Sequence, residues 1–225
     1  VTNAPGAHVT RDASRSYQGH SYRGRVLGVL MLSQFFAAFP LGMVTALIQL
    51  QYAHHHQASG VSWLSIVSQV GCVAAIIGLT RITLRQGRRL ALVLGMGLML
   101  AASVLGLVSA LLDVDLLLYL VAFLLGAGLA ANWYTPFAAT DFSSKTSRAS
   151  DFSYVLSMTA IGMALGSPVV NYTYYLEQQA EIPLGVIGFT LCMLCCMVSV
   201  IILWFGLHPI SGTMQQSEHL SEDND

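Results

Sequence analysis

Charge is scarce in this sequence. Asp, Glu, Lys and Arg together make up 9% of its 225 residues, against roughly a quarter in ordinary soluble domains. Hydrophobic residues make up 55%. The balance argues against a soluble domain and gives no basis for binding nucleic acid, so the composition indicates a protein whose main partner is the lipid bilayer.

Charged residues are also missing from the interior of the long apolar runs, of which there are six. Each run is close to the ~20 residues that a helix needs to cross ~30 Å of hydrocarbon. The runs are continuous rather than alternating, which favours helices over a β-barrel. We predict an all-α integral membrane protein, a six-transmembrane-helix bundle. Its spans are expected at 26–50, 61–80, 90–112, 116–140, 153–174 and 184–207, between a cytoplasmic tail at 1–25 and an acidic cytoplasmic tail at 208–225.

Histidine is absent from all six predicted spans, and paired carboxylates are absent at membrane depth. An intramembrane hydrolase needs a nucleophile with a base in reach. We therefore expect no enzyme, no catalytic residue and no cofactor. The triple histidine from His54 to His56 is interpreted as a solvated external turn rather than a metal site, because consecutive side chains on a helix do not face one way.

Cysteine gives no metal site either. Two cysteines with C-x-x-C spacing resemble a zinc or redox motif, but no histidine lies within the spans to complete a ligand set. Thiols in a lipid-embedded helix behave as small hydrophobes. The four cysteines are Cys72, Cys192, Cys195 and Cys196.

Lysine and arginine are confined to three places, the N-terminal stretch and the second and fourth connections. The positive-inside rule assigns these places to the cytoplasm, and six spans then return the C-terminus to the same side. No small-residue cleavage site closes the first run, so we expect a multi-pass protein of the inner (plasma) membrane with its first helix retained. The ten residues are Arg11, Arg15, Arg23, Arg25, Arg81, Arg85, Arg88, Arg89, Lys145 and Arg148.

The second connection holds more positive charge than orientation requires. Its sequence, RQGRRLALVLG, resembles the signature loop of the major facilitator superfamily, G-x-x-x-D-R-x-G-R-R before an apolar helix. Aligned on Gly87, Arg88 and Arg89, Arg85 takes the first basic position. Leu84 replaces the acidic residue, which in the family belongs to a charge network that holds neighbouring helix ends at the cytoplasmic gate.

A second resemblance lies in the fourth connection and the fifth span. Asp141 and Arg148 stand at the two ends of the connection, as an acid and a base do in the family. The fifth span carries GMALGSP, similar to the family's G-x-x-x-G-P pattern. Gly162 and Gly166 share one helix face and allow close helix packing, and Pro168 can bend the helix.

The resemblance matches the N-terminal six-helix half of a transporter that normally has two such halves. It implies alternating-access transport of a small, neutral or amphipathic molecule, by a half that acts as a parallel homodimer or is truncated from a longer protein. Because the family's first and fourth helices line its substrate cavity, the candidates for substrate contact are Gln34, Gln49, Asn132 and Tyr134. Interhelical hydrogen bonding is the alternative role for these side chains, and a non-transporting membrane scaffold or accessory subunit is the alternative function.

Overall fold

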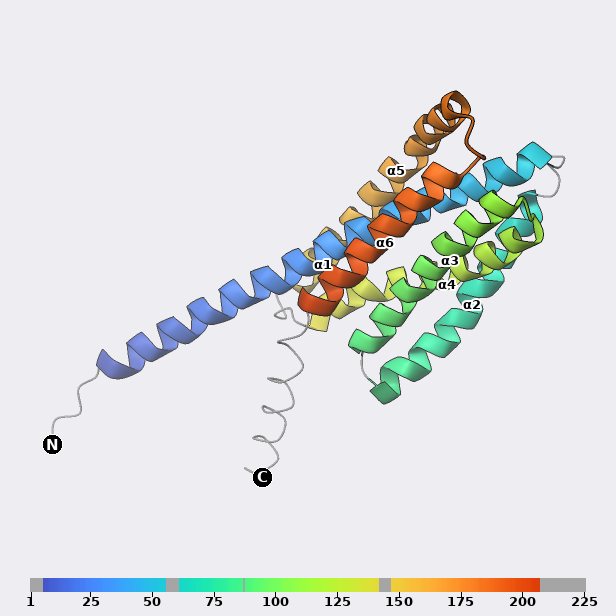
Figure 1. Ribbon diagram of the computed structural model, residues 1–225. Helices are drawn as coiled ribbons and strands as arrows, with labels where there is room; N and C mark the ends of the chain where they lie inside the picture. The colour runs from blue at the N-terminus through green and yellow to red at the C-terminus, as the bar shows by residue number, and fades with distance from the viewer. Residues whose placement is uncertain (1–5, 56–60, 87, 142–146, 207–225) are drawn as a thin grey trace.

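The computed structural model of the chain describes residues 6–55, 61–86, 88–141 and 147–206, and in this part of the chain all regular structure is helical (Figure 1). The predicted six-helix bundle is confirmed: each helix contains a stretch long and apolar enough to cross a membrane. The predicted acidic tail at 208–225 lies outside the described residues. The helices are α1 (Gly6–His55), α2 (Val61–Gln86), α3 (Arg88–Leu112), α4 (Leu116–Asp141), α5 (Arg148–Ala180) and α6 (Val186–Gly206).

The six helices pack in two layers. We call one layer the front layer and the other the back layer, and these names do not refer to the viewing direction of Figure 1. In the front layer, α2 packs against α4, α4 against α1, and α1 against α5. The back layer consists of α3, which packs against α4, and α6, which packs against α1, and the two back helices also meet each other. The first three helices and the last three make matching contacts. The α1–α5 contact corresponds to the α4–α2 contact, and the α3–α4 contact corresponds to the α6–α1 contact. That relation is expected of two inverted three-helix repeats within one half of a transporter.

Glycine brings α1 and α5 into backbone contact. A Cβ added at Gly162 would lie 2.8 Å from the carbonyl oxygen of Phe35, and one added at Gly166 would overlap the carbonyl oxygen of Phe39. Small residues permit such close approach of membrane helices. Pro168, two residues after Gly166, lies inside α5 on its exposed surface. The glycines singled out by the sequence pattern therefore lie at the main contact of α5.

The α2–α4 pair is built in the same way, although its glycines belong to no sequence motif. A Cβ added at Gly71 would overlap the carbonyl oxygen of Phe123, and one added at Gly126 would overlap that of Ser68. In both pairs the obstructing atom belongs to the backbone and cannot rotate away. The spacing of each pair thus depends on the absence of a side chain at these positions.

Two helices run beyond the predicted spans. α1 begins at Gly6, so most of the stretch predicted as a tail is helical and continues α1 away from the bundle (Figure 1). α5 has 33 residues and exceeds the predicted 153–174 at both ends. At 1.5 Å per residue it is about 50 Å long, more than the hydrocarbon thickness. Hydropathy detects only the apolar part of a helix, whereas the backbone hydrogen bonds continue through polar residues.

Candidate functional site

A buried amide joins three helices of the front layer. Gln34 of α1 is fully buried, and its Nε2 donates a hydrogen bond to Thr159 Oγ1 of α5 over 2.8 Å. The same Nε2 donates to Oδ1 of Asn132 on α4. Interhelical bonds of this kind are worth ~0.6 kcal/mol on average in membrane bundles. We call Gln34, Asn132 and Thr159 the Gln34 cluster.

A proline in α4 supplies the cluster with a further acceptor. Pro136 has no N–H, so the carbonyl of Asn132, four residues earlier, loses its usual helical partner. Nε2 of Gln34 lies 3.3 Å from that carbonyl oxygen, and one of its two N–H groups is shared between this oxygen and Oδ1 of Asn132. Neighbouring helices commonly satisfy backbone groups that proline frees within a membrane. Pro136 and Gln34 therefore act together, although they lie on different helices.

The Gln34 cluster lies within the packed bundle. Gln34 and Asn132 expose 0% and 2% of their surface. Among the described residues, Gln34 Oε1, Thr135 Oγ1 and Gln51 Oε1 are buried without a hydrogen-bond partner. The geometry gives Gln34 and Asn132 a role in joining helices, and their predicted contact with substrate stays a prediction.

The other two candidates have different surroundings. Gln49 is exposed, one turn after the exposed Thr45, and both lie within the membrane-spanning part of α1. Tyr134 is half-buried, and its hydroxyl is hydrogen-bonded to Thr80 Oγ1 of α2 over 2.5 Å. Of the four predicted residues, Gln49 is therefore the most open to a ligand.

The two layers differ in the side chains that they expose. Within the described spans, α1, α2 and α5 expose neutral polar residues, among them Thr45, Gln49, Ser65, Gln69, Ser167 and Asn171. The described parts of α3 and α6 expose apolar or tryptophan side chains, with no exposed Ser, Thr, Asn or Gln. Lipid tails cannot hydrogen-bond, so polar side chains in a span usually face protein or water. The back layer suits lipid, whereas the front layer suits a polar cavity or another protein surface.

Burial distinguishes the two end helices of the front layer from its two central helices. In the apolar windows of α2 and α5, 17% and 22% of the residues are buried, against 56% in α1 and in α4. The two helices at the ends of the front layer are thus the least covered in the bundle.

Two buried carboxylates on α5 were missed because they lie outside the predicted span. Glu177 is 1% exposed; its Oε2 accepts from the Gly185 N–H over 2.8 Å and its Oε1 from the Ile187 N–H over 2.7 Å. The N-terminus of a helix favours negative charge, so Glu177 caps α6. Asp151, 2% exposed, lies in the first turn of α5, where the same effect applies. No hydropathy pattern indicates the cap made by Glu177, because this residue and the capped helix α6 are separated by a connection.

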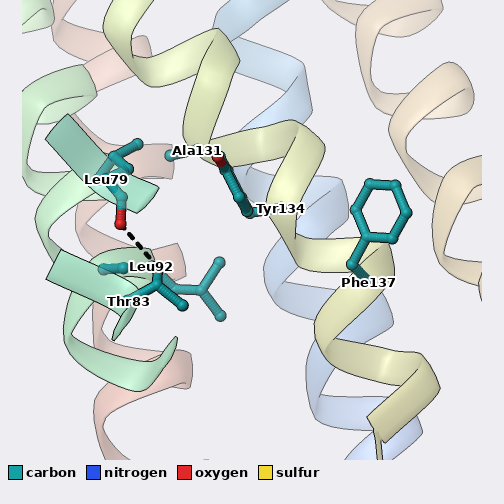
Figure 2. A pocket seen from close by; sticks show the side chains of 7 residues that line it. Leu79, Thr83, Leu92, Ala131, Tyr134 and Phe137 are labelled. Carbon is teal, nitrogen blue, oxygen red and sulfur yellow. Dashed lines mark hydrogen bonds between the residues drawn. The ribbon is translucent and has the colours of Figure 1, made fainter. Parts of the chain in front are cut away.

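A pocket of about 200 Å³ opens between α2, α3 and α4, near the arginine-bearing ends of α2 and α3. Figure 2 shows its lining from the three helices, with the Tyr134 ring on α4 between the α2 side chains and Phe137. The Thr83 hydroxyl is turned back onto the Leu79 carbonyl oxygen of its own helix, 2.8 Å away. The lining is largely apolar and consists of Leu79, Thr83, Ala91, Leu92, Ala131, Tyr134 and Phe137.

Comparison with known proteins decides the family. The sequence profile of the Major Facilitator Superfamily matches residues 30–219. The chain belongs to the major facilitator superfamily. It is a multi-pass membrane protein of this family, and the two-layer packing of its six helices agrees with that assignment.

Two curated relatives are major-facilitator-type transporters of Bacillus subtilis (strain 168) that are themselves described as uncharacterized. YdeG is 26% identical over 188 residues, which is 82% of this chain and 43% of the relative. YddS is 27% identical over 150 residues, 65% of this chain and 34% of the relative. No solved structure matches the chain. The chain thus spans less than half the length of the curated relatives it matches.

The residues of the major facilitator signature loop lie mostly on helices. Arg81 and Arg85 are exposed on the last turns of α2, and Leu84, at the position of the family's acid, is 82% exposed. Gly87 lies outside the described residues. Arg88 and Arg89 begin α3, but their side chains lie outside the described part of the chain.

The fourth connection is described only at its ends. Asp141 is the last residue of α4, with a side chain outside the description, and Arg148 is the exposed first residue of α5. Lys145 lies in the stretch 142–146, which is not described. The predicted gate formed by Asp141 and Arg148 stays a prediction.

Histidine and cysteine form no metal site in the described part of the chain, where no group of three or more His, Cys, Asp or Glu side chains could hold an ion. His54 and His55 end α1 with side chains outside the description, and His56 lies beyond it. Cys192 and Cys196 are buried in α6, where they pack as part of the apolar core.

Proposed function

We propose that this chain forms one six-helix half of an alternating-access transporter in the inner (plasma) membrane, which moves a small neutral or amphipathic molecule. One observation carries the proposal: the exposed neutral polar side chains lie on helices of the front layer, while the back layer exposes apolar ones. A bundle surrounded by lipid would expose apolar side chains on all sides. A half-transporter needs one polar wall and one lipid-facing wall.

The preference for a neutral or amphipathic substrate follows from the uncharged groups that the front layer exposes and from the positions of its buried carboxylates. Gln49 and Thr45 of α1 offer amide and hydroxyl groups, and Trp133 of α4 is 68% exposed and offers an aromatic face. The two buried carboxylates of α5 are at helix N-termini, where the helix dipoles favour their charge. Amides, hydroxyls and aromatic rings bind uncharged polar and amphipathic molecules.

The second wall of the cavity would come from a second six-helix half. The order of helices in the front layer is α2, α4, α1, α5. A two-fold axis along the membrane normal reverses this order, so α2 of one half would oppose α5 of the other. These are the two least buried helices of the bundle. A second copy in parallel, or the remainder of a longer polypeptide, would cover both.

Thiol cross-linking tests this arrangement. In a background with the four cysteines changed to alanine, Val73→Cys on α2 and Leu165→Cys on α5 are introduced into separate copies, both at exposed sites. The copies are mixed in lipid nanodiscs and treated with a bifunctional thiol reagent. A parallel dimer predicts a cross-linked α2–α5 product. Leu94→Cys on the exposed side of α3 is the matched control and should give none.

Each result has a definite meaning. A specific α2–α5 product supports a half-transporter that dimerises. If only monomer is found, and Val73→Cys and Leu165→Cys react with water-soluble thiol reagents, the second half is the remainder of a longer polypeptide. Equal labelling of Val73→Cys, Leu165→Cys and Leu94→Cys by a lipid-soluble reagent would contradict the proposal, because the front layer would then face lipid.

A further inference from the structure

The pocket between α2, α3 and α4 exists because small side chains meet there. The α2 and α4 backbones touch at Gly71 and Gly126. Beyond this contact, Ala91 of α3 and Ala131 of α4 are buried and line a space of about 200 Å³. An apolar cavity of about 150 Å³ is large enough to hold benzene. The pocket therefore has room for one aromatic ring or a short branched hydrocarbon group.

The pocket opens between α2 and α4, opposite its α3 floor. The α3 side chains of the lining, Ala91 and Leu92, are buried. The lining residues that reach the surface all belong to the front layer: Thr83 and Tyr134 are half-buried, and Phe137 is 54% exposed. A ligand would therefore enter from the front layer, whose exposed polar side chains indicate a cavity, and not from the lipid beside α3.

Aromatic side chains surround this opening. The Phe137 ring packs against the Phe152 ring of α5, with ring centroids 5.5 Å apart. Trp133 is 68% exposed within the apolar span of α4. Figure 2 shows the Tyr134 ring between α2 and Phe137. Aromatic rings offer a large and rigid contact area, so the mouth of the pocket suits a ligand that carries an apolar group.

The two hydroxyl groups of the described lining have already used their protons. Thr80 Oγ1 donates to the Ile76 carbonyl oxygen over 2.7 Å, so the Tyr134 hydroxyl is the donor in its bond to Thr80. The Thr83 hydroxyl donates to the Leu79 carbonyl oxygen over 2.8 Å. The other described lining side chains are apolar. A hydrophilic group in the pocket would lose its hydrogen bonds to water without replacement, which is unfavourable.

We propose that this pocket is the apolar subsite of the transport cavity, and that the substrate is amphipathic. An aromatic ring or branched hydrocarbon group of the substrate lies in the pocket, while its polar part stays at the mouth. The proposal rests on the proposed function, because a cavity at the front layer is what brings a substrate to this opening. It also narrows that function, since a fully hydrophilic molecule gains nothing from the pocket. Tyr134 then contacts substrate through its ring rather than through its hydroxyl.

Photolabelling tests the subsite without a transport assay. The probe is a benzyl alcohol with a trifluoromethyl diazirine on its ring, a neutral amphipathic molecule of suitable size. The full chain in lipid nanodiscs is illuminated with this probe, and the labelled positions are identified by mass spectrometry. We expect labels within 79–83 on α2 and 131–137 on α4. An excess of trifluoromethyl benzyl alcohol, which cannot cross-link, should abolish them, whereas labels on the exposed surfaces of α3 and α6 should not change.

Substitutions at Thr83 connect the labelling to the pocket. Thr83→Phe fills the pocket and should abolish the labelling that the competitor displaces. Thr83→Leu fills it less and should weaken this labelling; it serves as the test if the phenylalanine variant gives no monodisperse elution profile. Thr83→Val is the matched control, because it keeps the volume and removes only the hydroxyl, and it should label like the wild type. Ile76→Phe adds a ring at an exposed site of α2 outside the lining and should also label like the wild type.

Three results would overturn the proposal. Equal labelling of the pocket and of the exposed α3 and α6 surfaces, unchanged by the competitor, would show a probe that is merely dissolved in lipid. Displaceable labelling that survives in both Thr83→Phe and Thr83→Leu would place the binding site elsewhere. The third result separates this proposal from the proposed function. If a lipid-soluble reagent labels Val73→Cys, Leu165→Cys and Leu94→Cys equally while the probe still binds the pocket, the pocket binds ligands but belongs to no transport cavity.

Discussion

The α1–α5 and α2–α4 pairs occupy equivalent positions in the front layer but are held in different ways. Both bring backbones together at glycine. The α1–α5 pair adds a fully buried hydrogen bond, from Gln34 to Thr159, that also reaches α4. The α2–α4 pair has its interhelical hydrogen bond at Thr80 and Tyr134, at the edge of the pocket, where Thr80 is exposed.

The difference separates two physical roles. Glycine sets how closely two helices approach, because any side chain at the contact would meet backbone. Buried polar groups fix how the helices are aligned, because an unpaired amide is costly in a dry interior. The α1–α5 pair uses both devices, and the α2–α4 pair relies mainly on the first. We expect the bundle to tolerate the loss of a hydrogen-bonding side chain in the α2–α4 pair better than in the α1–α5 pair.

The largest effect should come from adding a methyl group at the glycine contacts. Gly166→Ala and Gly126→Ala each place a Cβ against a backbone carbonyl, so the helices must separate. Overpacking of this kind costs about 1–3 kcal/mol. The free energy of unfolding, measured by SDS titration in mixed micelles, should fall by similar amounts in both variants.

The controls for this test are Gly97→Ala on α3 and Gly78→Ala on α2, where an added Cβ has nothing within 4 Å. Alanine is the better helix former by about 1 kcal/mol, so these variants should be as stable as the wild type or slightly more stable. Equal destabilisation by all four substitutions would mean that the glycines matter for helix flexibility rather than for packing.

The next effect concerns Glu177, near the C-terminal end of α5, which has no counterpart in the described part of α2. Glu177→Ala removes the acceptor of the Gly185 and Ile187 N–H groups. Hydrogen bonds to a charged group are worth about 1.5–3 kcal/mol, so stability should fall by about 2 kcal/mol. Glu177→Gln keeps one acceptor oxygen and should lose less. Hydrogen exchange of the first turn of α6 is the local measurement, and unchanged exchange in Glu177→Ala would exclude the cap.

A double-mutant cycle tests the link between the Gln34 cluster and Pro136. Gln34→Leu leaves the Asn132 carbonyl and the Thr159 hydroxyl without their donor and should cost about 1–2 kcal/mol. Pro136→Ala restores the helical N–H for that carbonyl. The double variant should therefore be more stable than the sum of the single changes by about 0.5–1 kcal/mol. Simple additivity in SDS unfolding would show that the two residues act independently.

The smallest effect should come from the α2–α4 hydrogen bond. Thr80→Val and Tyr134→Phe each remove one partner of a bond at an exposed threonine, and water or lipid headgroups can replace it. The expected loss is below about 0.6 kcal/mol. A loss as large as that of Gln34→Leu would contradict the contrast between the two helix pairs.

Much of the fold was predictable because lipid imposes simple rules. Six apolar runs gave six helices, and the arginine turn together with Gly162 and Gly166 indicated the correct family. The helix ends were not predictable from hydropathy, since α5 continues through the polar residues from Arg148 to Asp151 and beyond residue 174. The N-terminal part of α1, which begins at Gly6, was not predicted as helical because it is polar.

The polar interior was predicted only in part. The family resemblance singled out Gln34 and Asn132 as polar residues of the first and fourth helices, but it does not distinguish a side chain that faces a cavity from one that joins two helices. That distinction depends on α5, whose Thr159 lies 125 residues from Gln34 along the chain. The roles of Pro136 and Glu177 also depend on partners from another helix, and a single sequence does not record such pairs.

The central claim is that the front layer faces a polar cavity while the back layer faces lipid. Spin labels at Thr45 on α1 and Val104 on α3 test it directly, because both are exposed and each lies eight residues before the end of its span, at Ala53 and Leu112. Collision rates with a water-soluble nickel complex and with oxygen are measured in nanodiscs. The account predicts that nickel reaches Thr45 far better than Val104, while oxygen favours Val104. Oxygen-dominated collisions at both sites would place both layers in lipid and contradict the claim.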